Sequence, residues 1–169
     1  MWGPGSLNYA LLIFRRIGPK GFTVLVTLVE LNDFYQHLFG RLFGRERRHG
    51  LAAAASAISP KKTLEGYAFG AAATHATAIV IGNVAPEAFF ALVSAKSSSY
   101  GDWPYIIVAV TVALFGSVGD LAMSRLKRYF SIKDSGSLLP GHGGILDRLD
   151  SLFTVLSVTW LWISLLRGE

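Results

Sequence analysis

The sequence predicts an all-α, polytopic transmembrane helical bundle of about four spans, preceded by a short apolar segment. Three observations lead to this fold class. Hydrophobic residues make up 51% of the 169 residues and charged residues 16%, whereas soluble domains carry about 25% charged residues. The apolar residues are gathered into runs long enough to cross a bilayer. The basic residues stand beside those runs, as they do at the cytoplasmic edge of a membrane.

The N-terminal part of the chain holds the short segment and the first span. Residues 6–14 are apolar but too few to cross a bilayer, so we expect a helix tail or an interfacial segment there. Residues 21–39 form the first predicted span, although Asn32 and Asp33 lie in its second half. A carboxylate in such a run must face protein or water, so Asp33 is a candidate for a polar cavity. A buried hydrogen-bonded pair with Asn32 is the alternative.

A basic loop leads to the second span. Residues 40–63 contain this loop, with a short helix expected at 51–57 and a helix contact at Gly40-x-x-x-Gly44. Residues 66–84 form the span, which is rich in the small residues that let membrane helices approach closely.

The C-terminal half supplies the other two spans. Residues 86–93 are apolar but short, and residues 103–123 form the third span, whose helical pattern continues to about residue 130. Residues 145–166 form the last helix. The positive-inside rule places the two charged loops, 40–63 and 124–148, on the cytoplasmic face of an inner or plasma membrane. Arg15, Arg16 and Lys20 oppose this orientation, but two loops outweigh one.

Composition excludes several classes of site and partner. The chain has no cysteine, so it has neither disulfides nor a thiolate metal site. Its net charge of +5 comes from basic clusters beside the apolar runs, which favours membrane lipids and phosphates as partners and not nucleic acid.

Carboxylates and basic residues gather around residues 120–150. Residues at i, i+4 and i+7 share a helix face, which aligns Asp120, Ser124 and Lys127, with Arg128 beside them. Asp147 and Asp150 are three residues apart and also face one way. If the last two spans pack together, the three aspartates can surround a divalent cation such as Mg²⁺. The alternative is that the aspartates pair with Arg128 and Arg148 at a membrane edge.

A second basic site precedes the second span. Lys61 and Lys62 stand directly before Thr63 and Glu65, and anionic phosphate is favoured near the N–H groups at a helix start. The alternative is an ordinary basic loop before a capped helix.

The same residues carry a family resemblance. The run S-x-L-K-R-x4-K-D-x-G-x2-L-P-x-H-G-G-I-x-D-R-L-D, from Ser124 to Asp150, resembles the C-terminal motif of the phosphatidate cytidylyltransferases, or CDP-diacylglycerol synthases. About a dozen positions of one short window agree. Upstream, Asn32-Asp33, the Gly-x-x-x-Gly and Ser59-Pro60-Lys61-Lys62-Thr63-Leu64-Glu65-Gly66 follow in the family's order. The resemblance spans about residues 20–169.

The resemblance implies a membrane nucleotidyltransferase that transfers the cytidylyl group of CTP to phosphatidate, giving CDP-diacylglycerol and pyrophosphate. It implies Mg²⁺ on Asp120, Asp147 and Asp150, with a second cation left open, and a catalytic role for Lys127 beside these aspartates. Phosphates of CTP and the lipid would be bound by residues from both blocks: Asp33, Lys61, Lys62, Ser124, Arg128, Lys133, Asp134, His142, Gly143, Gly144 and Arg148. His142 is equally well interpreted as a structural hydrogen-bond donor within its loop.

The resemblance further implies that residues 1–169 form a single membrane domain equivalent to the family's C-terminal catalytic half, with the N-terminal spans absent. A homodimer is left open. The alternatives are a related CTP-using lipid enzyme (a polyprenol-type kinase or the archaeal-lipid cytidylyltransferase), a non-catalytic scaffold or truncated form, and a transporter-like protein.

Overall fold

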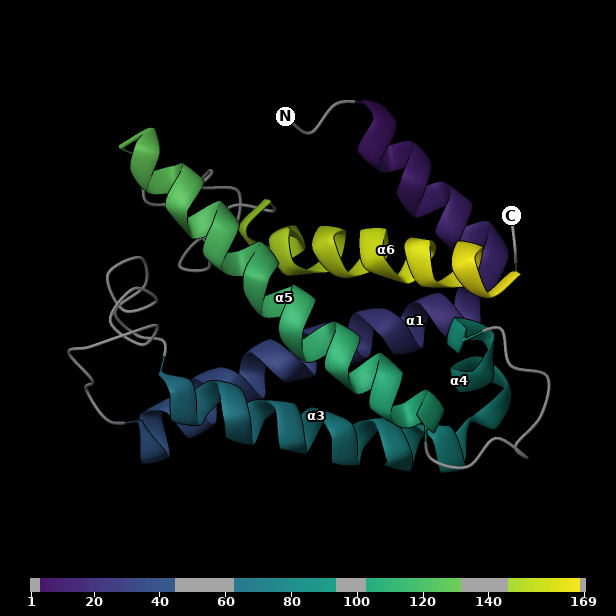
Figure 1. Ribbon diagram of the computed structural model, residues 1–169, viewed down its shortest axis with the longest axis horizontal. Coiled ribbons are helices and arrows are strands. Elements are labelled where there is room, and N and C mark those ends of the chain that lie inside the picture. The colour runs from purple at the N-terminus through teal and green to yellow at the C-terminus, as the bar shows by residue number, and fades with distance from the viewer. Residues whose placement is uncertain (1–3, 45–62, 94–102, 132–145, 168–169) are drawn as a thin grey trace.

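A computed structural model describes residues 4–44, 63–93, 103–131 and 146–167, and every regular element in these ranges is a helix. The helices are α1 (Pro4–Phe43), α3 (Leu64–Val84), α4 (Pro86–Val93), α5 (Trp103–Tyr129) and α6 (Leu146–Arg167), arranged as one bundle (Figure 1). The predicted all-α class is therefore confirmed for the described residues. The short helix expected at 51–57 lies outside them.

The predicted N-terminal segment and first span are two parts of α1, which bends sharply between them (Figure 1). The bend lies at Gly18, whose φ of 71° suits glycine because a side chain would be strained there. Pro19 follows and has no N–H to continue the hydrogen-bond ladder of the helix. The helix tail expected at 6–14 is therefore confirmed as part of the N-terminal piece of α1, and the helix resumes directly after the bend.

Helices α1 and α3 run antiparallel in very close contact. The buried face of α3 is a stripe of small residues spaced four apart: Gly66, Gly70, Thr74, Ala78 and Gly82. A Cβ built on Gly66 would lie 2.6 Å from the carbonyl oxygen of Gln36 and 2.9 Å from Cα of Gly40. The glycines thus allow backbone-to-backbone approach, and the predicted contact at Gly40 is confirmed.

We expect Gly66→Ala to destabilise the protein, because its new methyl group would collide with the rigid backbone of α1. Overpacking of this kind costs about 1–3 kcal/mol. The measurement is the melting temperature in detergent. Gly116→Ala on α5 is the control, since a methyl group there would make ordinary contacts at 3.6–3.9 Å. Equal melting temperatures for the two variants would contradict the close contact of α1 and α3.

The bundle is apolar outside and partly polar inside. On α5 the residues Ile106, Val110, Leu114 and Val118 form an exposed stripe, each between 47% and 58% accessible. Fully or nearly buried polar side chains lie within: Asn32, Thr74, Thr111, Ser117, Ser151 and Thr159. Large exposed apolar surfaces of this kind are typical of a face that contacts a membrane or another protein.

Helix α5 meets the length and apolarity needed to cross a bilayer, over Pro104–Tyr129, with a mean hydropathy of 2.1 in its most apolar window. It is the one helix among the described residues that does so, and the apolar run of α6, Ser151–Trp162, is shorter. Helix length and apolarity therefore support one of the four predicted spans.

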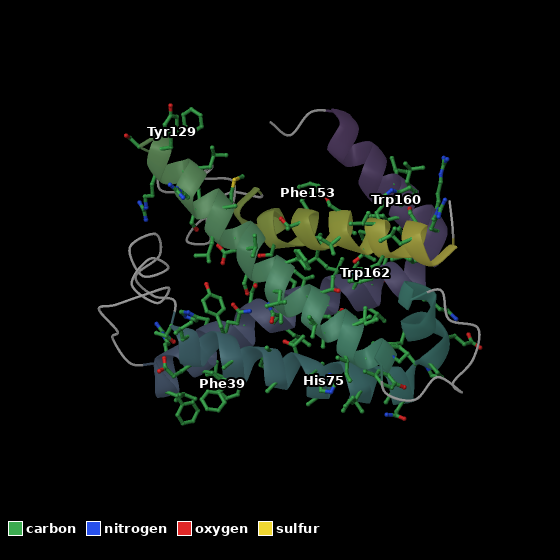
Figure 2. All side chains as sticks on the ribbon, in the orientation of Figure 1. Phe39, His75, Tyr129, Phe153, Trp160 and Trp162 are labelled. Carbon is green, nitrogen blue, oxygen red and sulfur yellow. The ribbon has the colours of Figure 1, made fainter. Side chains whose placement is uncertain are left out.

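The far end of α6 packs against the N-terminal part of α1. Trp160 lies beside this part of α1 (Figure 2), and Cζ of Arg16 stands 4.6 Å from the centre of its ring. This cation–π contact stabilises a positive charge at the end of the bundle that is remote from the start of α6.

Candidate functional site

The site predicted around residues 120–150 begins on the last turns of α5. Asp120, Ser124 and Lys127 are half-buried, whereas Arg125 and Arg128 are exposed. The hydroxyl of Ser124 lies 3.4 Å from Oδ1 of Asp120, the carboxylate one turn before it. Helix α5 ends just beyond, at Tyr129, which Figure 2 labels at the tip of the helix. One half-buried stripe at the C-terminal end of α5 therefore carries a carboxylate, a hydroxyl and an amine.

The other predicted carboxylates are placed by the start of α6. Asp147 and Asp150 belong to its first turns, where a negative charge is favoured by the helix dipole. Arg148 lies between them. The structure describes the backbone of these three residues, and described side chains begin at Ser151.

Helices α5 and α6 contact each other at Gly116 and Ser151. A Cβ built on Gly116 would lie 3.6 Å from Cγ2 of Val155 and 3.9 Å from Cβ of Ser151. The two helices run in opposite directions, so one turn toward the charged end leads from Gly116 to Asp120 and from Ser151 to Asp147 (Figure 1). Asp120 and Asp147 are therefore each one turn away from a helix contact that the structure describes.

Asp33 joins this region from α1. The hydroxyl of Ser151 donates a hydrogen bond to Oδ2 of Asp33, at 3.0 Å, across 118 residues of sequence. The hydroxyl of Tyr67, at the start of α3, is buried and lies within electrostatic reach of the same carboxylate. Asp33 of α1 therefore contacts α6 at Ser151, the residue after Asp150, and lies at a junction of α1, α3 and α6.

Further polar side chains line the junction, and the sequence interpretation missed them. Gln36 of α1 is hydrogen-bonded to Ser117 of α5, with Nε2 donating to Oγ at 2.8 Å. Asn32 is hydrogen-bonded to Thr74 of α3, whose hydroxyl lies 3.1 Å from Oδ1, and this contact does not involve Asp33, with which a buried pair was the alternative interpretation. Gln36 follows Asn32 by one turn, a spacing that could have indicated a polar face on α1.

The remaining predicted residues lie outside the described part of the chain. They are the two loop lysines, the Lys-Asp pair and the glycine-rich turn: Lys61, Lys62, Lys133, Asp134, His142, Gly143 and Gly144. Thr63, directly after the loop lysines, caps α3 by accepting a hydrogen bond from the N–H of Gly66 at 3.1 Å. The described side chains include no group of three or more His, Asp or Glu close enough to hold a metal ion.

These features define a class of protein: a helical bundle with an apolar surface, a candidate membrane-spanning helix and carboxylates at one end. The chain matches the cytidylyltransferase family over residues 5–166 and belongs to that family.

Named relatives agree with the family. Over 129 residues the chain is 36% identical to a phosphatidate cytidylyltransferase of Staphylococcus saprophyticus and 38% identical to that of Staphylococcus haemolyticus. It is 37% identical to that of Staphylococcus aureus over the same length. Each alignment covers 76% of this chain and 43% of the relative, so the chain matches less than half the length of these curated relatives.

Proposed function

We propose that the protein transfers the cytidylyl group of CTP to phosphatidate, giving CDP-diacylglycerol and pyrophosphate. The observation that carries the proposal is the unbroken charged motif from Ser124 to Asp150 in a chain of the cytidylyltransferase family. The half-buried stripe on α5 and the polar junction beside α6 support it, because both lie next to that motif. The intact charged positions of this motif argue against a non-catalytic scaffold, which has no use for them.

Asp120, Asp147 and Asp150 would hold Mg²⁺. Three carboxylates from two packed helices suit this hard cation, which takes oxygen ligands and keeps some water or substrate oxygens. The contact between Gly116 and Ser151 supports the assignment. Asp120 lies one turn after Gly116 on α5, and Asp147 lies one turn before Ser151 on α6. When bound, Mg²⁺ would neutralise charge on the phosphate oxygens.

The reaction asks mainly for position and charge neutralisation from the protein. A phosphate oxygen of phosphatidate attacks the α-phosphorus of CTP, and the bond to pyrophosphate breaks as the new P–O bond forms. Lys127 would neutralise the reacting phosphates from the stripe on α5, with Arg128 beside it. Lys61, Lys62 and Lys133 would gather the anionic substrates, and the turn at His142, Gly143 and Gly144 would approach the nucleotide closely.

The acyl chains of phosphatidate would stay in the bilayer. The exposed apolar stripe of α5 supports a membrane location. We propose four spans across the bilayer, with the charged end of the bundle in the cytoplasm. The ends of α1 and α5 and the starts of α3 and α6 lie toward one side of the bundle (Figure 1). Both charged loops would therefore leave from that side. A homodimer stays a prediction.

We expect the protein to remain in the membrane pellet after alkaline carbonate extraction. The reason is the exposed apolar surface of the bundle together with the span in α5. Immunoblotting of pellet and supernatant measures it. Release into the supernatant would contradict a multi-pass membrane protein.

The function is tested by incubating purified protein in detergent with Mg²⁺, phosphatidate and CTP labelled in either the base or the γ-phosphate. Cytidylyl transfer puts the base label, and no γ label, into the lipid fraction. A polyprenol-type kinase would do the reverse when given a polyprenol. Comparing phosphatidate with an archaeal-type ether lipid phosphate as acceptor distinguishes the two kinds of cytidylyltransferase. The absence of labelled lipid with every acceptor would contradict the proposed function.

A further inference from the structure

One outer face of α1 differs from the apolar outside of the bundle, because it is polar. After the bend at Gly18, exposed residues recur along α1 at alternating spacings of four and three. Spacings of this kind place side chains on one face of a helix, along which a second helix can pack. These residues form the polar face of α1: Thr23, Thr27, Glu30, Phe34, His37 and Arg41.

Glu30 is the residue of this face that most needs an explanation. Its side chain is exposed, and among the residues that the structure describes no basic side chain pairs with it. Arg41 lies further along the same face, about 16 Å away along the helix axis at 1.5 Å per residue. With Arg41 at the edge of the bilayer, Glu30 lies near the middle of a hydrocarbon core about 30 Å thick. A carboxylate at that depth is costly unless it faces protein or water.

The polar face of α1 is turned away from α3 and α5. Asn32 is hydrogen-bonded to α3 through Thr74, and Gln36 is hydrogen-bonded to α5 through Ser117. Each of these two residues follows a member of the polar face by two positions, which on a helix means about 200° of rotation. The contacts of α1 with α3 and α5 therefore lie nearly opposite Glu30, and they leave its carboxylate on the outside of the bundle.

A second copy of the chain is a poor partner for this face. Two copies inserted in the same orientation are related by a rotation axis along the membrane normal. Two α1 helices that met at this axis would place Glu30 against Glu30 and Arg41 against Arg41. Like charges repel each other most strongly where the dielectric constant is low, as it is inside a bilayer. A partner of different sequence can instead bring the opposite charge to each position.

We propose that the polar face of α1 binds a transmembrane helix that is none of the five described helices. This partner helix carries a lysine or arginine at mid-membrane, opposite Glu30, and a carboxylate near the cytoplasmic edge, opposite Arg41. Ionisable residues within membrane spans commonly pair with one another, and such a pair removes the cost of a lone carboxylate in lipid. The short side chains of Thr23 and Thr27 let the partner approach closely. This inference rests on the four spans proposed above and is independent of the proposed reaction.

The test uses the full chain in phosphatidylcholine vesicles with two synthetic transmembrane peptides of leucine and alanine. One peptide has a lysine at its centre and the other a leucine, and each carries the same glutamate at one end. Association is measured by energy transfer from the tryptophans of the protein to a dansyl group on the peptide. We expect the lysine peptide to bind about tenfold more tightly than the leucine peptide.

Glu30→Leu should abolish this preference and keep the wild-type melting temperature, because the side chain is exposed. Glu87→Leu is the control, since it removes an exposed carboxylate on α4, and it should keep the preference. Equal binding of the two peptides by the wild type would overturn the proposal. A preference for the lysine peptide that persisted in Glu30→Leu would also overturn it.

A second measurement distinguishes the other possible occupants of the polar face. The chain has no cysteine, so Thr27→Cys and Arg41→Cys each introduce a single thiol. In vesicles without peptide, we expect a charged maleimide to label Arg41→Cys at the bilayer edge and to leave Thr27→Cys unmodified. Rapid labelling of Thr27→Cys would assign the face to water. A disulfide-linked dimer of Thr27→Cys on oxidation would assign it to a second copy, and either result would overturn the proposal. The lipid-product assay plays no part here, so a failure of the proposed function is detected separately.

Discussion

Replacing Asp147 or Asp150 by asparagine should abolish Mg²⁺-dependent product formation while the protein remains folded. Each change removes one charged oxygen ligand with almost no change in side-chain volume, so packing at the start of α6 is kept. Loss of charge stabilisation at a transferring phosphoryl group lowers kcat by on the order of 100-fold or more. The measurement is the rate of lipid labelling at ordinary Mg²⁺ concentration, with the melting temperature as the check on folding.

Glu87→Gln is the matched control for these two variants. Glu87 is an exposed carboxylate on α4, and its Oε2 lies 3.9 Å from Nζ of the exposed Lys20. Its replacement should leave the rate unchanged, because it lies at the end of the bundle away from the start of α6. Near-normal turnover of either aspartate variant would remove that residue from the proposed metal site.

Lys127→Ala and Lys61→Ala should affect different kinetic constants. Lys127 is half-buried on the stripe that carries Asp120, so its charge should act on the phosphates as they react. We expect its loss to lower kcat by on the order of 100-fold. Lys61 lies in the basic loop and should bind substrate and transition state equally, so its loss should mainly raise KM. We expect Lys61 to act through a partly exposed charge, so the effect of its loss should fade as salt is added.

Arg125→Ala controls for the loss of a positive charge from α5. Arg125 is exposed and lies off the stripe, so both kcat and KM should stay near the wild-type values. Steady-state kinetics in CTP and in phosphatidate, at low and high salt, separate the constants. Similar kcat losses for Lys61→Ala and Lys127→Ala would contradict the assignment of Lys127 to the transition state and of Lys61 to substrate binding.

The helices were largely predictable, because their signals are local. The expected span at 66–84 corresponds to α3, Leu64–Val84, and the pattern from 103 to about 130 corresponds to α5, Trp103–Tyr129. The bend of α1 was not predicted, since Gly18 and Pro19 are compatible with either the end of one helix or a kink within it. Here the choice between the two depends on what the following residues pack against.

By itself, the sequence determined the helical class, the order of the helices and the charged motif between Ser124 and Asp150. These follow from composition, from apolar run length and from the spacing of charged residues, all of which are properties of neighbours in the chain. The tertiary structure alone decided that Asp33 meets Ser151, that Asn32 turns to Thr74, and that one end of its amide faces Gly116. These contacts join residues far apart in sequence. They depend on the rotation and closeness of packed helices, which periodicity along one helix does not specify.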